Sequence, residues 1–331
     1  MSSSQNVIYF PYINLPQESW FTTTLLYWDT IYSIVPNEYT QYPIMLEEYT
    51  RTLIEEHLVK PIVPMNYIEH IPNFNHQFLS FIDRRDYPVN RKMRDTALPK
   101  VKVHIEKLGD LAEELVRRKL AIIDKYPWYY VESYTAHQFM LYLATELGKL
   151  KQINGKPITD DLIQYELFQA QQHRDHNLEL TISEIRPIIL DEILPTPINS
   201  VDPRDILNFK DDNKKLLINF RNDIETNLIY LAGFDGTKKE QKISYFIDLK
   251  KKQIAELKMV MESYGWKVRL SKIAGYTIAT LGIIYTLTKG EPVSVFATAS
   301  GLIPSIVQDL FQRTQINPNN MAYAVLAHQK F

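Results

Sequence analysis

The spacing of apolar and polar positions over residues 1–70 predicts a small parallel α/β unit. A β-branched and aromatic run at 7–13 is typical of a buried strand, and shorter runs follow at 33–36 and 59–64. Helical apolar spacing over 18–31 and 43–57 separates these runs. This order implies a parallel sheet with right-handed crossovers. The turn at 11–16 has no glycine-rich loop, which excludes a dinucleotide or P-loop site there.

Beyond residue 73 the apolar spacing is mainly helical. It predicts helices over 74–84, 101–125 and 132–152, and the Asn-Gly-Lys-Pro sequence at 154–157 predicts a turn. The proline-interrupted, β-branched segment 178–197 is a candidate for one more strand of the sheet. Asp202 and Pro203 predict a helix start, and helices over 203–231 and 237–264 are predicted to form an antiparallel pair.

The predicted fold is therefore mostly α with a small N-terminal parallel α/β unit (α+β overall) and a C-terminal hydrophobic helical hairpin. Four parts are expected along the chain. Residues 1–70 form the α/β unit, and 71–200 form a helical region that includes the candidate strand. Residues 201–264 form the antiparallel helical pair, and 265–331 form the hairpin and a C-terminal tail.

The predicted hairpin consists of two uncharged segments, 273–287 and 292–308. Both are apolar around most of their circumference, and both carry small residues at helical spacing, which allow two helices to approach closely. These positions are candidates for membrane or assembly contacts: Gly275, Ala279, Gly282, Thr286, Ser294, Thr298, Gly301 and Ser305. A basic flank suited to an anionic membrane surface precedes them: Lys250, Lys251, Lys252, Lys267, Arg269 and Lys272.

The length of the hairpin favours a different interpretation. Uncharged helices of this length span roughly 22 and 25 Å at about 1.5 Å per residue, whereas a bilayer core is about 30 Å thick. Pro304 also interrupts the second segment. Burial in the protein or in a subunit interface and insertion in a membrane both remain open.

The composition limits the expected localisation of the protein and the kinds of chemistry that it can perform. The chain has 331 residues, a formal net charge of −2 and no cysteine, which excludes disulfides, thiolate catalysis and cysteine-ligated metals. A near-neutral charge favours no nucleic-acid partner. The N-terminus has no positively charged region before an apolar run, so no signal peptide is expected. We expect a cytoplasmic protein, with the hairpin as a possible peripheral or inserted element at the inner membrane.

Two polar clusters are candidates for chemistry. His173 and His176 lie three residues apart and could share a helix face as metal ligands, although no third ligand stands beside them and the segment is also typical of a solvated helix end. The Asp-Arg-Arg-Asp run at 83–86 could bind a phosphate or form local ion pairs at a helix end. The sequence assigns no catalytic residue and no cofactor.

Aromatic residues and prolines bracket the strands of the N-terminal unit. Tyr9-Phe10-Pro11-Tyr12-Ile13 is followed by Trp20, Leu25-Leu26-Tyr27-Trp28-Asp29-Thr30-Ile31 and Ile34-Val35-Pro36. This signature is similar to that of a widespread bacterial family known only as a domain of unknown function. The likeness continues through 132–161 and 194–220. The resemblance implies no reaction, cofactor or catalytic residue.

Three hypotheses of function remain open. The favoured one is a non-enzymatic interaction or scaffold protein with a protein partner or self-association. The resemblance alone suggests a component of a bacterial accessory system such as phage defence or a toxin module. Its α/β unit would be organised by aromatic residues: Tyr9, Tyr12, Trp20, Tyr27 and Trp28. The second hypothesis is a membrane-active effector that inserts the hairpin. The third is an enzyme with an unrecognised site.

Overall fold

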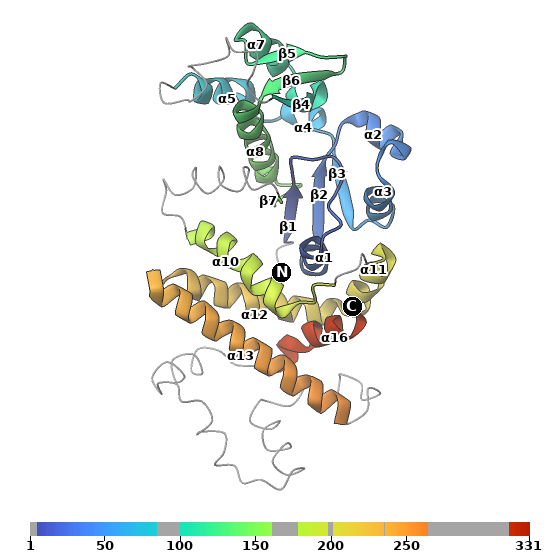
Figure 1. The fold of residues 1–331 in the computed structure, drawn as a ribbon, viewed down its shortest axis with the longest axis vertical. Helices are drawn as coiled ribbons and strands as arrows, with labels where there is room; N and C mark the ends of the chain where they lie inside the picture. Colours follow the sequence, from blue (N-terminus) through green and yellow to red (C-terminus); the bar gives the residue numbers. More distant parts are fainter. Residues whose placement is uncertain (1–4, 85–99, 161–177, 198–200, 235, 264–317) are drawn as a thin grey trace. The chain divides into compact units, whose positions relative to one another are not determined.

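A computed structural model describes residues 5–84, 100–160, 178–197, 201–234, 236–263 and 318–331 (Figure 1). Contacts between residues divide the chain into two compact units. Unit 1 comprises 1–177 and 200–207, and unit 2 comprises 178–199 and 208–331. The described chain is mostly helical with a small parallel-sheet unit near its N-terminus, which confirms the predicted fold class at that level.

The first sheet of unit 1 is entirely parallel and has the strand order β3-β2-β1-β7. Its strands are β1 (Asn6–Tyr9), β2 (Thr30–Ile34), β3 (Val59–Ile62) and β7 (Gly155–Ile158). The intervening helices are α1 (Ser19–Tyr27), α2 (Asn37–Gln41), η1 (Pro43–Met45) and α3 (Glu48–Glu55). Strand β1 is buried along its whole length, as expected for an inner strand of a parallel sheet.

The second sheet of unit 1 is antiparallel, with the order β4-β6-β5. It contains β4 (Lys100–His104), β5 (Ala121–Ile123) and β6 (Trp128–Glu132). Short helices precede it or connect its strands: α4 (Met65–Ile68), α5 (Phe74–Ile82), α6 (Ile105–Leu108) and α7 (Leu111–Arg117). Residue Gly109, which separates α6 from α7, has a φ of +56°, a conformation that glycine adopts without strain.

Helix α8 (Ser133–Lys149) joins the two sheets of unit 1, and it packs on β4 and on β7 (Figure 1). The Glu132 carboxylate caps its first turn by accepting the backbone N–H groups of Tyr134 (3.0 Å) and Thr135 (2.8 Å). A negative charge there also complements the helix dipole. At the other end, a Cβ on Gly148 would lie 2.1 Å from the carbonyl oxygen of Gly155, so this close packing requires glycine.

The regular secondary structure in the described residues of unit 2 is helical. It contains α10 (Leu178–Ile193), α12 (Lys214–Ala232), α13 (Gly236–Ser263), η5 (Pro318–Met321) and α16 (Ala322–Lys330), and α11 (Pro203–Asp212) begins in unit 1 and ends in unit 2. The C-terminal helix α16 belongs to the core of unit 2, because Tyr323 is fully buried and its ring lies 5.8 Å from that of Phe220.

Several sequence predictions of elements are confirmed. The three predicted parallel strands are present in neighbouring positions, and helices predicted over 74–84, 132–152 and 237–264 correspond to α5, α8 and α13. The helix predicted over 203–231 is divided at Asn213 into α11 and α12. None of the helices in the described ranges has the length and apolar character needed to cross a membrane.

Three element predictions are wrong, and each has a physical reason. The segment predicted as one helix over 101–125 contains β4, α6, α7 and β5, because β4 and β5 both pair with β6. The predicted turn at 154–157 is strand β7, which pairs with β1. The candidate strand at 178–197 is helix α10, whose buried isoleucines follow helical spacing while its internal proline is exposed: Ile182, Ile185, Ile189, Ile193 and Pro187.

Candidate functional site

A pocket of about 630 Å³ lies in unit 1 at the carboxyl ends of strands β1 and β7. Tyr9 ends β1, and Ile158, its partner in the register, ends β7. The chain leaves β1 through α1 toward β2 on one side, whereas β7 lies on the other side of β1. This arrangement is a topological switch point, the place where open α/β sheets bind ligands. We call this cavity the switch-point pocket.

The β1–α1 loop forms one wall of the pocket, with 11–16 all contributing to the lining. Reciprocal hydrogen bonds fix this loop to the start of α3. The Asn14 side chain donates to Glu47 Oε1 (3.1 Å), and its Oδ1 accepts the backbone N–H of Glu47 (3.1 Å). The buried backbone N–H of Leu15 donates to Thr50 Oγ1 (2.8 Å). The wall is therefore preformed by contacts that involve no ligand.

A tyrosine–aspartate pair joins the two strand ends at the pocket. Tyr9 donates its hydroxyl to Asp160 Oδ1 at 3.1 Å, and both residues line the pocket. Burial, followed by the charge of Asp160, raises the pKa of Tyr9 well above its ordinary value. The phenol therefore remains protonated near neutral pH. The pair places a hydroxyl and a carboxylate on the floor of the pocket.

Lys107, on the short helix α6, brings a nearly fully buried amine to the same pocket. The residue is 4% exposed, and Nζ donates a hydrogen bond to the carbonyl oxygen of Pro11 at 3.0 Å. No carboxylate in the described part of the chain forms an ion pair with it. Burial disfavours the charged form and lowers the pKa of Lys107 to about 7. A substantial fraction of the amine is therefore neutral at neutral pH.

His104 ends β4 and lines the pocket beside Lys107. Its Nδ1 accepts the backbone N–H of Glu106 (3.2 Å), so the neutral ring carries its hydrogen on Nε2. Nε2 lies 3.2 Å from Glu38 Oε1, and the Trp128 ring packs edge-on against the imidazole, with the ring centroids 5.0 Å apart. Burial lowers the pKa of His104, while the nearby Glu38 carboxylate opposes that shift. Near neutral pH the ring is therefore mainly uncharged.

Lys102 provides a contrast to Lys107 within the same lining. It is an exposed lysine whose Nζ forms an ion pair with Asp124 (3.0 Å) and lies over the Trp128 and Tyr130 rings at 5.4 and 5.9 Å from their centroids. The hydrogen bond to Asp124 raises the pKa of Lys102. One pocket therefore carries two lysines whose pKa values are shifted in opposite directions.

The remaining lining is mainly apolar or aromatic. Ala136 and Met140 of α8 and Val103 of β4 are almost fully buried, whereas Tyr12 and Met45 are about half exposed (51% and 48%). A concave, largely apolar cavity with a few convergent polar groups is typical of small-molecule sites, whose volumes run from about 300 to 1,000 Å³. Among the described residues, no group of three or more metal-ligating side chains is arranged to hold a metal ion.

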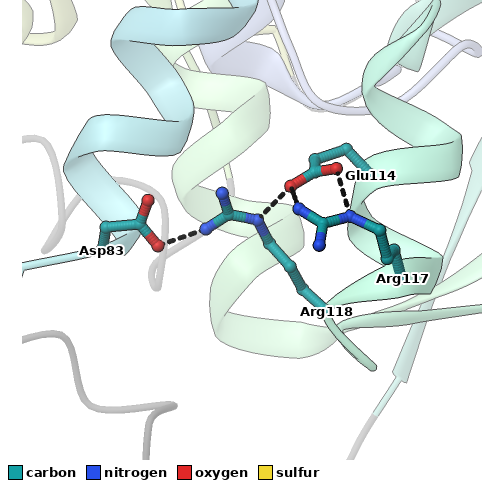
Figure 2. A network of polar contacts seen from close by, with 4 residues as sticks. All are labelled: Asp83, Glu114, Arg117 and Arg118. Atoms are coloured by element: carbon teal, nitrogen blue, oxygen red, sulfur yellow. Dashed lines mark hydrogen bonds and ion pairs between the residues drawn. The ribbon is translucent and has the colours of Figure 1, made fainter.

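The acidic and basic residues around 83 form a polar network instead of a separate pocket. Figure 2 shows Arg118 between Asp83, the residue after α5, and Glu114 of α7. Arg117 also contacts Glu114, with Nε 2.8 Å from Oε2. The hydrogen bonds from the two arginines lower the pKa of Glu114 to about 2. Asp83 is therefore ion-paired with an arginine far along the chain, whereas the sequence predicted local pairs within the run 83–86, whose last two residues lie outside the described residues.

The other residues singled out in the sequence are distributed as follows. Lys250 is buried in an ion pair with Asp223 (2.5 Å), Lys251 pairs with Glu192 on the surface of unit 2, and Lys252 is exposed on α13. Lys267, Arg269, Lys272, His173, His176 and the eight small residues of the hairpin lie outside the described residues. Their predicted roles in metal binding, assembly or membrane contact stay predictions.

The aromatic residues predicted to organise the α/β unit differ in burial. Tyr9, Tyr27 and Trp28 are buried, Trp20 is partly exposed, and Tyr12 is about half exposed. Of these residues, Tyr9 and Tyr12 line the pocket. Lys107, His104 and Asp160 were not predicted from the sequence to form a site. Their common signal is their position at or shortly after the end of a strand, and that signal requires β4 and β7 to be recognised as strands.

Comparison of the chain with protein-family models, with curated proteins and with solved structures found no match.

Proposed function

We propose that this chain binds a small organic molecule in the switch-point pocket of unit 1. The observation that carries the proposal is the position of the pocket, at the carboxyl ends of β1 and β7 where the direction of the connections changes. Its volume of about 630 Å³ suits a metabolite-sized molecule. Tyr12, Met45 and Trp128 supply apolar surface for the body of the ligand, and the buried polar groups supply its orientation.

The polar groups indicate which ligand features the pocket accepts. The Tyr9–Asp160 pair offers a carboxylate oxygen to hydroxyl or amino groups. The Lys107 amine faces the same cavity and has one hydrogen-bond acceptor, the Pro11 carbonyl, within the described residues. A ligand that brings an oxygen atom to Lys107 would complete its hydrogen bonding. We therefore propose a polar ligand with hydroxyl and carbonyl or carboxylate oxygens.

A thermal-shift screen tests this function. The panel contains sugar phosphates, nucleotides, amino acids and small oxoacids, since a ligand that binds only the folded state raises its stability by about 2.7 kcal/mol at 100 times its Kd. The test variant is Tyr12→Ala in the pocket wall (51% exposed), and the matched control is Tyr42→Ala, another exposed tyrosine (62%) outside the lining. Both positions are exposed, so neither substitution should unfold the chain.

We expect at least one compound class to raise the melting temperature of the wild type and of Tyr42→Ala. Tyr12→Ala should weaken its binding roughly tenfold, the size expected for loss of one aromatic contact. A panel that stabilises none of the three proteins, or stabilises all three equally, would contradict binding in this pocket.

A further inference from the structure

The chemistry of Lys107 extends the small-molecule function proposed above, and it rests on that function. A buried lysine normally has a carboxylate partner, because burial of an unpaired charge costs several kcal/mol. Lys107 has a carbonyl oxygen as its hydrogen-bond partner in the described part of the chain. Val103, Ala136 and Met140, which line the same pocket, are apolar and buried. Lys107 is itself nearly fully buried, so its amine is largely removed from water.

We propose that Lys107 is a nucleophilic amine that binds the carbonyl carbon of a small aldehyde or ketone as an imine in the switch-point pocket. A lysine reacts with a carbonyl only through the lone pair of its neutral form, and desolvation is one of the ways in which proteins obtain that form. Its location in a cavity with room for a metabolite gives a carbonyl carbon access to Nζ. The burial that lowers the pKa of Lys107 to about 7 supports the same conclusion.

The step balances without a co-reactant. The Nζ lone pair forms a bond to the carbonyl carbon, and the electrons of the carbonyl π bond move to the oxygen. One amine hydrogen then moves to that oxygen, which gives a carbinolamine. The C–O bond then breaks, and the second amine hydrogen leaves with the oxygen as water. The products are a neutral imine on Lys107 and one water molecule. No atom changes its oxidation state, so the step requires no oxidant or reductant.

Two features of the pocket suit this step. Pro11 O accepts one Nζ hydrogen and so orients the amine, leaving its lone pair and other hydrogen for a ligand. The Tyr9–Asp160 pair is placed to bind polar substituents of the same molecule, because both of its residues line the cavity. The other lysine of the lining, Lys102, lacks these features, since it is exposed and paired with Asp124.

The test is reductive trapping on the native full-length chain. The protein is incubated with glycolaldehyde or pyruvate at about pH 7.5 in the presence of cyanoborohydride, which reduces an imine to a stable secondary amine, and the modified lysines are located by peptide mass spectrometry. We expect Lys107 to be labelled at least about tenfold faster than Lys102, because an ordinary lysine with a pKa near 10.4 is almost entirely protonated at this pH.

A sample unfolded in urea provides the matched control. There the two lysines should react at similar rates, since unfolding removes the burial of Lys107. Labelling of Lys102 at the same rate as Lys107, or faster, in the native chain would overturn the imine proposal. That result would leave the thermal-shift evidence for the pocket unaffected. Conversely, selective labelling of Lys107 together with a failed thermal-shift panel would support the reactive amine and count against the proposed ligand classes.

The Lys107→Arg variant separates imine formation from simple charge pairing. Arginine keeps a positive charge at this position, but it does not form an imine with these carbonyl compounds under the same conditions. If the ligand were held through an ion pair with Lys107, Lys107→Arg would retain binding of a compound found by thermal shift. Retained affinity within about twofold would therefore overturn the imine proposal, and a loss of about tenfold or more with an unchanged circular dichroism spectrum would support it.

Discussion

Within the described residues, unit 1 and unit 2 each bury one lysine, and the two lysines differ in their surroundings. Lys107 in unit 1 is 4% exposed and Lys250 in unit 2 is 3% exposed. Lys250 lies 2.5 Å from Asp223 Oδ2, in a pair whose two side chains are both buried, and its Nζ also stands over the Phe246 ring at 5.2 Å from the centroid. Lys107 has a backbone carbonyl in place of the carboxylate.

The two lysines differ in whether a carboxylate compensates the charge of the buried amine. An ion pair offsets much of the cost of burying both charges, so neither Lys250 nor Asp223 is left as an isolated buried charge in unit 2. The same logic applies to Arg186 and Glu225, which form two hydrogen bonds of 2.7 Å. A buried amine without a counter-ion lowers stability, and such a residue is more often found where function requires it.

The largest expected effect concerns the pH dependence of the stability of unit 1. Burial lowers the pKa of Lys107 from 10.5 to about 7 in the folded chain, while the unfolded chain keeps an ordinary lysine pKa. Between these two values the unfolded state binds more protons, so the free energy of unfolding rises with pH across this window. A difference of about 3.5 pH units corresponds to about 5 kcal/mol in full, at about 1.4 kcal/mol per unit.

The Lys107→Met variant should lack this rise. At pH 7 it should be more stable than the wild type, and the difference should close as the pH approaches 10. Urea unfolding, followed by tryptophan fluorescence in a Trp266→Phe background, measures unit 1, because Trp20, Trp28 and Trp128 all belong to it. Lys102→Met serves as the control and should follow the wild-type profile. Parallel profiles for Lys107→Met and the wild type would show that the buried amine does not titrate as described.

The next effect concerns unit 2 and has the opposite sign. Lys250→Met leaves the Asp223 carboxylate buried without its partner, which typically costs about 3–5 kcal/mol of unfolding free energy. The control is Lys251→Met, whose partner Glu192 is about half exposed, and this substitution should cost no more than about 1 kcal/mol. Urea unfolding followed by circular dichroism at neutral pH measures both. Equal losses in the two variants would remove the distinction between the two lysines.

The sequence predicted the part of the fold in which local pattern and tertiary pairing agree. The β-branched runs that became β1 and β2 lie on inner strands of the parallel sheet, where burial on both faces favours apolar runs, and the run that became β3 lies beside β2 at the edge. Helix α8 was also predicted, since its apolar residues follow helical spacing and a glycine-containing segment ends it. These elements predict the position of the parallel sheet along the chain. They do not predict that β7 pairs with β1, and so they do not predict the pocket at the carboxyl ends of these two strands.

The switch-point pocket could not be predicted because its key residues lie in segments that were assigned to other elements. Lys107 and His104 fall within 101–125, which was predicted as one helix. Asp160 follows the four-residue strand β7, a segment that was predicted as a turn. A strand that short, with an internal proline, carries little pattern of its own, and its pairing with β1 becomes evident only in three dimensions.

The position of α16 changes how the hairpin hypotheses should be tested. Removal of all residues after Ser263 would take away Tyr323 and Val325, which are buried in unit 2. Loss of solubility in such a truncation would then report a damaged core. An internal deletion of 265–317, joined by a flexible linker, keeps α16 and isolates the contribution of the uncharged segments.

The smallest predicted effect concerns His104, which is intermediate between the two lysines because it is buried and lies near a carboxylate, Glu38 Oε1, at 3.2 Å. Burial lowers its pKa below 6.5 and Glu38 opposes the shift. Glu38→Gln should therefore lower the His104 pKa further, as measured by NMR titration of the imidazole C–H signals. Between pH 6.5 and the lower pKa of the folded state, the unfolded state binds more protons, so the free energy of unfolding decreases as the pH falls. Glu38→Gln should increase this loss of stability, because it lowers the folded-state pKa of His104 further.

Glu114→Gln is the matched control for this titration, because Glu114 is an acid of unit 1 that pairs with arginines outside the pocket lining. It should leave the His104 pKa unchanged. An unchanged His104 pKa in Glu38→Gln would mean that the carboxylate does not act on the ring. His104 would then resemble Lys107, a buried base whose charged form finds no carboxylate partner in the fold. A His104 pKa that falls in Glu38→Gln would show that Glu38 partly compensates the charge of the ring, which makes His104 intermediate between Lys107 and Lys250.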